Sequence, residues 1–162
     1  MLDKLHKLLR AFAPGSSARP AIVFDEDDHR VAAAGLLVHA MNADGVRSPS
    51  ELARVEALLA ERFSLDRHEV QALIKAADRR NREAVDFNAF TGIVRRAYNE
   101  EGRARIVEMM WEIVFADGTL HEFEDNMVWR VAEIIGVPAD QRMLIRRKVA
   151  ASRGIEIAEA SE

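Results

Sequence analysis

Apolar residues recur every three or four positions along most of the chain, and charged or polar residues fill the positions between them. This spacing is typical of amphipathic α-helices, and no segment shows the sustained two-residue alternation of a β-strand bounded by turns. The pattern predicts an all-α fold, a compact bundle of about seven to eight helices with short connections. The predicted apolar faces include Leu5, Val38, Leu59, Leu73, Phe90, Met110, Val131 and Val149.

The chain divides into three parts where this pattern changes. Residues 1–20 are predicted to form an N-terminal amphipathic helix and a linker that contains Pro14 and Gly15. Residues 21–153 are predicted to form the helical domain, and residues 154–162 a frayed tail. Docking of the first helix on the domain is the simplest interpretation of the N-terminal part. Peripheral contact of its basic face with a membrane is the alternative.

Composition excludes several classes of function. The 162 residues fit one domain, and none is a cysteine, which excludes disulfides, Cys-ligated metals and thiol redox chemistry. The formal net charge of −4 argues against nucleic-acid binding. No apolar run approaches the roughly 20 residues of a membrane span, and charges interrupt the N-terminal segment. We therefore expect a cytoplasmic protein.

Basic residues are frequent on the last predicted helix. They are Arg142, Arg146, Arg147 and Lys148. Charged stretches of this kind are usually helix faces exposed to solvent, and we interpret these residues in that way. The alternative is that they bind an acidic partner protein. The two tryptophans, Trp111 and Trp129, are expected to pack between helices.

A short motif occurs twice. Ala43-Asp44-Gly45 is followed by Glu51, and Ala116-Asp117-Gly118 is followed by Glu124, so that each Glu comes seven residues after its Asp. An apolar helix precedes each copy and another helix follows it. The repeat predicts that the domain consists of two pseudo-symmetric helix–loop–helix halves.

The spacing of Asp, Gly and Glu in the motif is that of the second half of a calcium-binding EF-hand loop. Apolar or amide side chains occupy the earlier ligand positions in both copies, so neither loop should bind calcium alone. Two loops brought together would supply enough carboxylates for a hard divalent ion. The candidate metal ligands are Asp44, Glu51, Asp117 and Glu124. The ion would be calcium, magnesium, manganese or zinc, and no organic cofactor is expected.

The same residues also have a purely structural interpretation. Asp-Gly is a common turn sequence. Glu51 lies three residues after Ser48, as in a helix capping box, and Glu124 is placed in the same way behind His121. His39 and His121 are near enough to the motifs in sequence to join a metal site, although the spacing does not require it.

The residues around the second motif resemble those of the TerB-like tellurite-resistance family. The resemblance lies in the segment Met110-Trp111-Glu112-Ile113-Val114-Phe115-Ala116-Asp117-Gly118-Thr119-Leu120-His121-Glu122-Phe123-Glu124, continues to Val137, and includes Asp86-Phe87-Asn88-Ala89-Phe90-Thr91 upstream. It extends over about residues 25–152. It implies an all-helical domain with pseudo-symmetric halves, whose acidic residues bind a metal ion in a bacterial response to tellurite and other stresses. The first motif departs from the pattern at Pro49 and Ser50.

No catalytic motif accompanies these features, because the chain has no nucleophile elbow, phosphate-binding glycine loop or His-Glu-x-x-His pair. We therefore expect a non-enzymatic domain that binds a divalent cation at the paired loops. The competing hypothesis is a helical adaptor or co-chaperone-like module that binds a protein partner without metal. A homodimer is compatible with both hypotheses.

Overall fold

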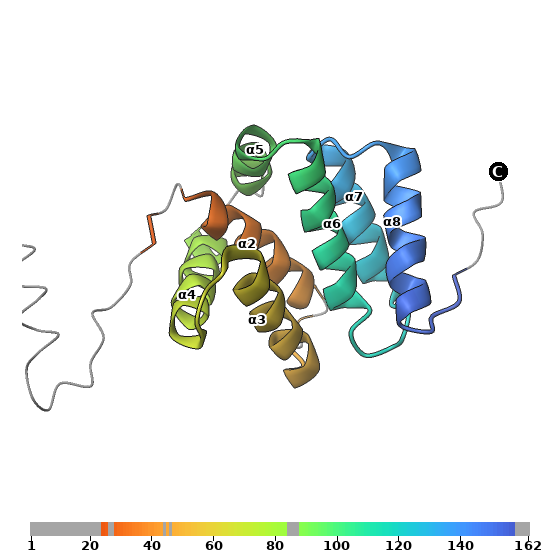
Figure 1. Ribbon diagram of the computed structural model, residues 1–162, viewed down its shortest axis with the longest axis horizontal. Coiled ribbons are helices and arrows are strands. Elements are labelled where there is room, and N and C mark those ends of the chain that lie inside the picture. Colours follow the sequence, from red (N-terminus) through yellow and green to blue (C-terminus); the bar gives the residue numbers. More distant parts are fainter. Residues whose placement is uncertain (1–23, 26–27, 44, 46, 84–87, 158–162) are drawn as a thin grey trace, which may run out of the picture.

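The computed structural model describes residues 24–25, 28–43, 45, 47–83 and 88–157. This part of the chain forms seven α-helices and no strand, which confirms the predicted all-α class (Figure 1). The helices are α2 (His29–Met41), α3 (Pro49–Phe63), α4 (Arg67–Glu83), α5 (Asn88–Ala97), α6 (Glu100–Val114), α7 (Glu122–Ile134) and α8 (Ala139–Ser152). The helix predicted within residues 1–20, the residues Asp44, Asp86 and Phe87, and the end of the tail lie outside the described residues. None of the described helices is long and apolar enough to cross a membrane.

Helix α2 lies at the centre of the N-terminal half. It packs against α3, α4, α5 and α6, and ten of its 13 residues are buried. Many of those residues are alanines, whose small side chains let neighbouring helices approach closely on several sides. Its start is fixed by Asp28, whose side chain accepts a hydrogen bond from the Arg30 backbone N–H at 2.9 Å. Asp28 is therefore the N-cap of α2.

Helix α6 has the same central position among the C-terminal helices. It packs against α7 and α8, and it also contacts α2 and α3 (Figure 1). Its apolar side chains, with those of α2, form nearly half of the core, in which Trp111 and Met110 of α6 are fully buried. The two groups α2–α4 and α6–α8 thus meet along α2 and α6. A twofold relation between them stays a prediction.

Two helix starts agree with the sequence in detail. Ser48 is the N-cap of α3, with Pro49 in the first turn, and Asn99 caps α6 by accepting a hydrogen bond from Gly102 N–H at 2.9 Å. In the connections that follow α2 and α6, Gly45 and Gly118 have positive φ angles of 77° and 79°. Other residues rarely adopt this conformation, so glycine explains why the chain can turn between the paired helices at both places.

Candidate functional site

The second motif forms a compact cluster of polar side chains in the connection between α6 and α7. The backbone N–H and the hydroxyl of Thr119 both donate to Asp117 Oδ1, at 3.0 and 2.8 Å. The His121 Nε2 atom lies 3.0 Å from Asp117 Oδ2 and 2.9 Å from Thr119 Oγ1. We refer to Asp117, Thr119 and His121 as the Asp117 cluster. It faces solvent, because 39% of the Asp117 side chain and 48% of the His121 side chain are exposed.

The Asp117 carboxylate is stabilised in its charged form. Partial burial opposes ionisation, but the hydrogen bonds from His121 and Thr119 outweigh this effect and lower the pKa of Asp117 below its ordinary value. The connection therefore presents an exposed negative charge next to an imidazole at neutral pH. A carboxylate and an imidazole are both common ligands of divalent transition metals.

His121 does not cap α7 with its side chain. It occupies the N-cap position, but its imidazole makes no cap hydrogen bond and contacts Asp117 instead. The His121 side chain therefore does not supply its half of a capping box, and the capping role of Glu124 stays a prediction. Glu124 itself is buried in the first turn of α7, with 3% of its surface exposed.

The first motif is arranged differently. Ser48 Oγ accepts a hydrogen bond from Glu51 N–H at 3.1 Å, and the Ser48 hydroxyl donates to Glu51 Oε1 at 2.9 Å. Glu51 therefore stabilises the start of α3, as its structural interpretation predicted. Arg47, in the same connection, pairs with Asp78 of α4 at 2.8 Å. The remaining candidate of this motif, Asp44, lies outside the described residues.

The described residues contain no group of three His, Asp or Glu side chains placed to hold a metal ion. The structure therefore brings Asp117 and His121 together, and it does not show Glu51 or Glu124 in a shared site with them. Asp44 lies outside the described residues, so its position relative to this pair is not defined. A metal site at the Asp117 cluster would need further ligands beyond this pair, because most divalent ions take at least four.

A buried polar network near this loop was not predicted from the sequence. Asp125 accepts a hydrogen bond from Trp111 Nε1 at 3.0 Å, and Arg146 donates to both of its carboxylate oxygens at 2.6 to 3.1 Å. The interpretation of the basic residues of the last helix as a solvated face is wrong for Arg142, which is 8% exposed and lies 4.6 Å from the Trp129 ring centroid. Arg142 and Arg146 of α8 therefore point inward, toward α7.

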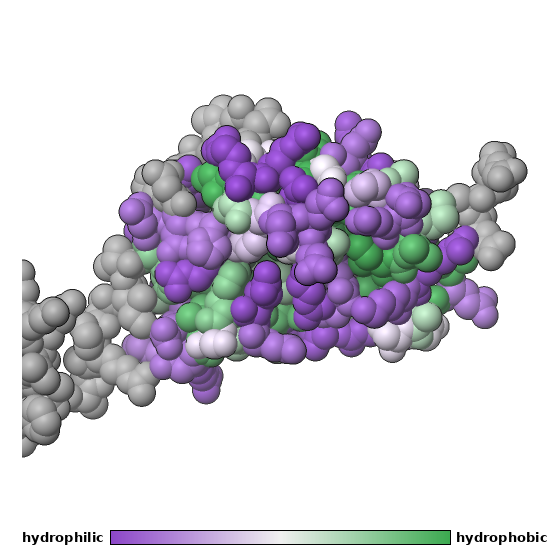
Figure 2. Space-filling view, turned by 45° about the horizontal axis from the view of Figure 1, so that its top comes forward, coloured by the Kyte–Doolittle hydropathy of each residue, from purple (hydrophilic) through white to green (hydrophobic). Residues whose placement is uncertain are grey.

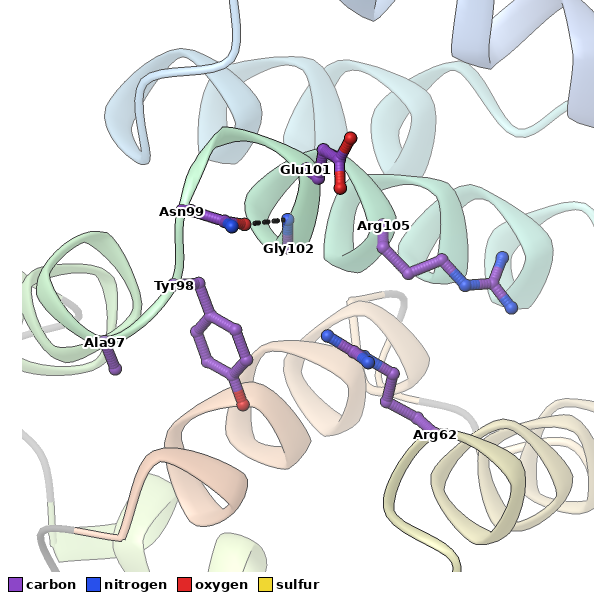
Figure 3. A pocket seen from close by; sticks show the side chains of 7 residues that line it. All are labelled: Arg62, Ala97, Tyr98, Asn99, Glu101, Gly102 and Arg105. Carbon is purple, nitrogen blue, oxygen red and sulfur yellow. Dashed lines mark hydrogen bonds between the residues drawn. The ribbon is translucent and has the colours of Figure 1, made fainter.

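A polar cleft of about 590 Å³ lies where α3, α5 and α6 meet (Figure 3). Arg62 reaches from the end of α3 toward Tyr98, and Arg105 of α6 lines the cleft while pairing with Glu108 at 3.2 Å. The Tyr98 hydroxyl donates to the His29 carbonyl at 3.2 Å, and burial raises the pKa of Tyr98 to about 12. Tyr98 is therefore a neutral structural residue that ties the start of α6 to α2.

Comparison with known families decides the identity of the fold. The model of a family described as Tellurite resistance protein TerB matches residues 30–147. The chain belongs to the TerB family. The match includes both copies of the motif and helices α3 to α7 completely, and it confirms the resemblance read from the second motif.

Solved structures include one whose fold is similar to that of this TerB-family domain. It is the crystal structure of a protein of unknown function from Porphyromonas gingivalis W83, which is 19% identical in sequence, with a TM-score of 0.59. The similarity extends over 85% of this chain and 98% of the other chain. At this identity the similarity concerns the fold alone. No curated protein matches the chain.

Proposed function

We propose that this TerB-family domain binds a divalent cation at its Asp-Gly loops and acts by binding, not by catalysis, in a bacterial response to metal or tellurite stress in the cytoplasm. The observation that carries the proposal is the Asp117 cluster. There the N-cap side chain of α7 leaves the helix end and contacts the loop carboxylate, 3.0 Å away, at the protein surface. At the start of α3, by contrast, the N-cap residue Ser48 accepts a hydrogen bond from the first turn.

The donor set favours a transition metal. Asp117 Oδ2 and His121 Nε2 would be the ligands in the second loop, and the carboxylate of Asp44 the ligand from the first loop. Imidazole together with carboxylate suits zinc or manganese, whereas calcium requires six to eight oxygen ligands. The buried carboxylates Glu51 and Glu124 are the other members of the proposed set, each in the first turn of the helix after its loop.

Thermal unfolding of EDTA-treated protein tests this proposal, with calcium, magnesium, manganese and zinc added separately. A ligand at 100 times its dissociation constant stabilises the folded state by about 2.7 kcal/mol, a shift of several degrees in a domain of this size. We expect a saturable shift with zinc or manganese and a smaller one with calcium or magnesium. Isothermal titration calorimetry then gives the dissociation constant and the stoichiometry.

Asp117→Asn and His121→Ala should each abolish the shift, because each removes one ligand. Asp140→Asn is the matched control, since Asp140 is an exposed carboxylate in the first turn of α8. Equal metal binding by Asp117→Asn and the unaltered protein would refute the site. The absence of a shift with all four ions would refute the proposed function.

A further inference from the structure

Two arginines from different helices converge at the end of α7. Arg95 is in the last turn of α5, and Arg103 is near the start of α6. The connection between α5 and α6 lies at the same end of the molecule as the connection between α7 and α8 (Figure 1). A Cβ atom at Gly136, which follows α7, would lie 3.8 Å from Arg103 Nη1 and 3.9 Å from Arg95 Nε. Both guanidinium groups therefore lie against the same point, and we refer to Arg95 and Arg103 as the arginine pair.

The arginine pair has no carboxylate partner among the described residues, whereas Arg54 and Arg146 pair with carboxylates at 2.8 and 2.6 Å. The hydrogen bonds of the pair go to carbonyl groups instead. Arg95 Nη1 donates to the Ile134 carbonyl and Arg103 Nη1 donates to the Arg95 carbonyl, each at 3.4 Å. The Nε atom of Arg103 is buried and has no hydrogen-bond partner among the described residues. Because a guanidinium group carries several N–H donors, most donors of the pair are left without a partner there.

Helix capping accounts for part of this arrangement. The two accepting carbonyls belong to the last turns of α5 and α7, and the C-terminal end of a helix carries about half of a negative elementary charge. Two helix ends therefore balance roughly one of the two positive charges. Both hydrogen bonds are also longer than the usual N–H···O distance. Capping thus leaves an excess of positive charge, which a small anion between the guanidinium groups would balance.

Solvent and small ions have access to the arginine pair. Arg95 and Gly136 are exposed, and Arg103 is half-buried. Figure 2, in which this end of the molecule is turned forward, shows hydrophilic side chains gathered over it. The adjacent Arg96 is exposed as well, but its guanidinium group lies over its own helix, with Nη1 3.4 Å from the position of a Cβ atom at Gly92. Arg96 therefore carries the same charge without taking part in the convergence.

We propose that the arginine pair binds a phosphate group, either of the free ion or of a small phosphate monoester. The planar guanidinium group offers parallel N–H donors that match two oxygens of a phosphate. A phosphate group carries about 1.5 to 2 negative charges at pH 7, which complements the two positive charges of the pair. The open side of the site leaves room for the substituent of a monoester. The pair lies at the opposite end of α7 from the Asp117 cluster, so this inference is independent of the proposed metal site.

Isothermal titration calorimetry of the full chain with inorganic phosphate tests the inference, at an ionic strength held constant with sodium chloride. Arg95→Gln and Arg103→Gln should each raise the dissociation constant about tenfold or more, because each removes one of the two guanidinium groups. The matched control is Arg96→Gln, which removes an exposed charge from the same turn of α5 and should leave the affinity unchanged. The dissociation constant is compared because loss of a helix cap can lower the melting temperature by itself.

A second titration, with O-phosphoserine, identifies the source of the phosphate group. Tighter binding of O-phosphoserine than of inorganic phosphate indicates a monoester, and the reverse order indicates the free ion. Either result supports the site if Arg95→Gln and Arg103→Gln weaken it. The absence of saturable binding with both ligands would overturn the inference. So would an unchanged affinity in Arg103→Gln, or equal losses in Arg95→Gln and Arg96→Gln, because the attraction would then be a general effect of surface charge.

Discussion

At the scale of single residues, Asp125 connects three helices. It lies in the first turn of α7, is 8% exposed, and accepts hydrogen bonds from Trp111 of α6 and from Arg146 of α8. The carboxylate therefore satisfies a buried indole N–H and a half-buried guanidinium at once. A charged group with partners on two sides fixes the relative positions of the helices that carry those partners.

Replacement of Asp125 by alanine should lower the free energy of unfolding by about 3 kcal/mol, because it leaves the Arg146 charge and the Trp111 N–H without their partner. Urea denaturation followed by circular dichroism measures this change. Asp140→Ala, which removes an exposed carboxylate from α8, should change the stability by less than about 0.5 kcal/mol. Similar losses in the two variants would contradict the role assigned to Asp125.

His39 should make stability depend on pH. Burial in α2 lowers the pKa of His39 below its ordinary value of 6.5, so the folded protein holds a proton at this residue less readily than the unfolded chain does. Below about pH 6.5 the unfolded chain binds a proton at this residue more readily than the folded chain does, and the folded state loses stability. His39→Gln should reduce the loss of stability between pH 7.5 and pH 5.5, as measured by urea denaturation. The control is His68→Gln, at an exposed position of α4, and an equal reduction in both variants would refute the assignment.

At the scale of the helices, α2 and α5 approach each other closely at Gly35. A Cβ atom at Gly35 of α2 would lie 2.9 Å from the ring of Phe90, which is 1% exposed in α5. Alanine at Gly35 should therefore force Phe90 to move, although alanine favours helices by about 1 kcal/mol over glycine. Glycine at this position allows α2 and α5 to pack on each other, and this packing matters more for stability than the low helix propensity of glycine.

Gly35→Ala should destabilise the domain by about 1 to 3 kcal/mol through overpacking. Gly92→Ala is the matched control inside α5, because its Cβ would meet only the flexible end of Arg96 at 3.4 Å. It should stabilise the domain by about 0.5 to 1 kcal/mol. Thermal melts of both variants measure the difference, and an increase in stability with Gly35→Ala would show that α2 and α5 are not in tight contact.

The sequence predicts those features that depend on neighbouring residues. The start of α3 could be predicted because Ser48, Pro49 and Glu51 act on the same helix turn. The hydrogen bonds of Asp125 with Trp111 and Arg146 could not be predicted in this way. These partners are 14 and 21 positions away from Asp125 in the sequence, and whether they meet depends on how three helices are rotated against each other. Likewise, the spacing of the second motif indicated Asp117 as a candidate but not that His121 would contact it.

At the scale of the whole molecule, the two helix groups share one core. Helices α2 and α6 pack on each other, and Arg54 of α3 donates to Glu112 of α6 at 2.8 Å. Small domains whose parts share a core usually unfold in a single transition. We therefore expect the groups α2–α4 and α6–α8 to unfold together.

The two tryptophans make this expectation testable, because Trp111 and Trp129 lie in α6 and α7 and report on the C-terminal group alone. Leu73→Ala changes the other group, since Leu73 is fully buried in α4, which packs on α2 and α3. It should lower the free energy of unfolding by about 3 kcal/mol. If the groups unfold together, the tryptophan fluorescence transition and the circular dichroism transition shift to the same lower urea concentration. A fluorescence transition that stays in place while circular dichroism divides into two steps would show that each group folds independently.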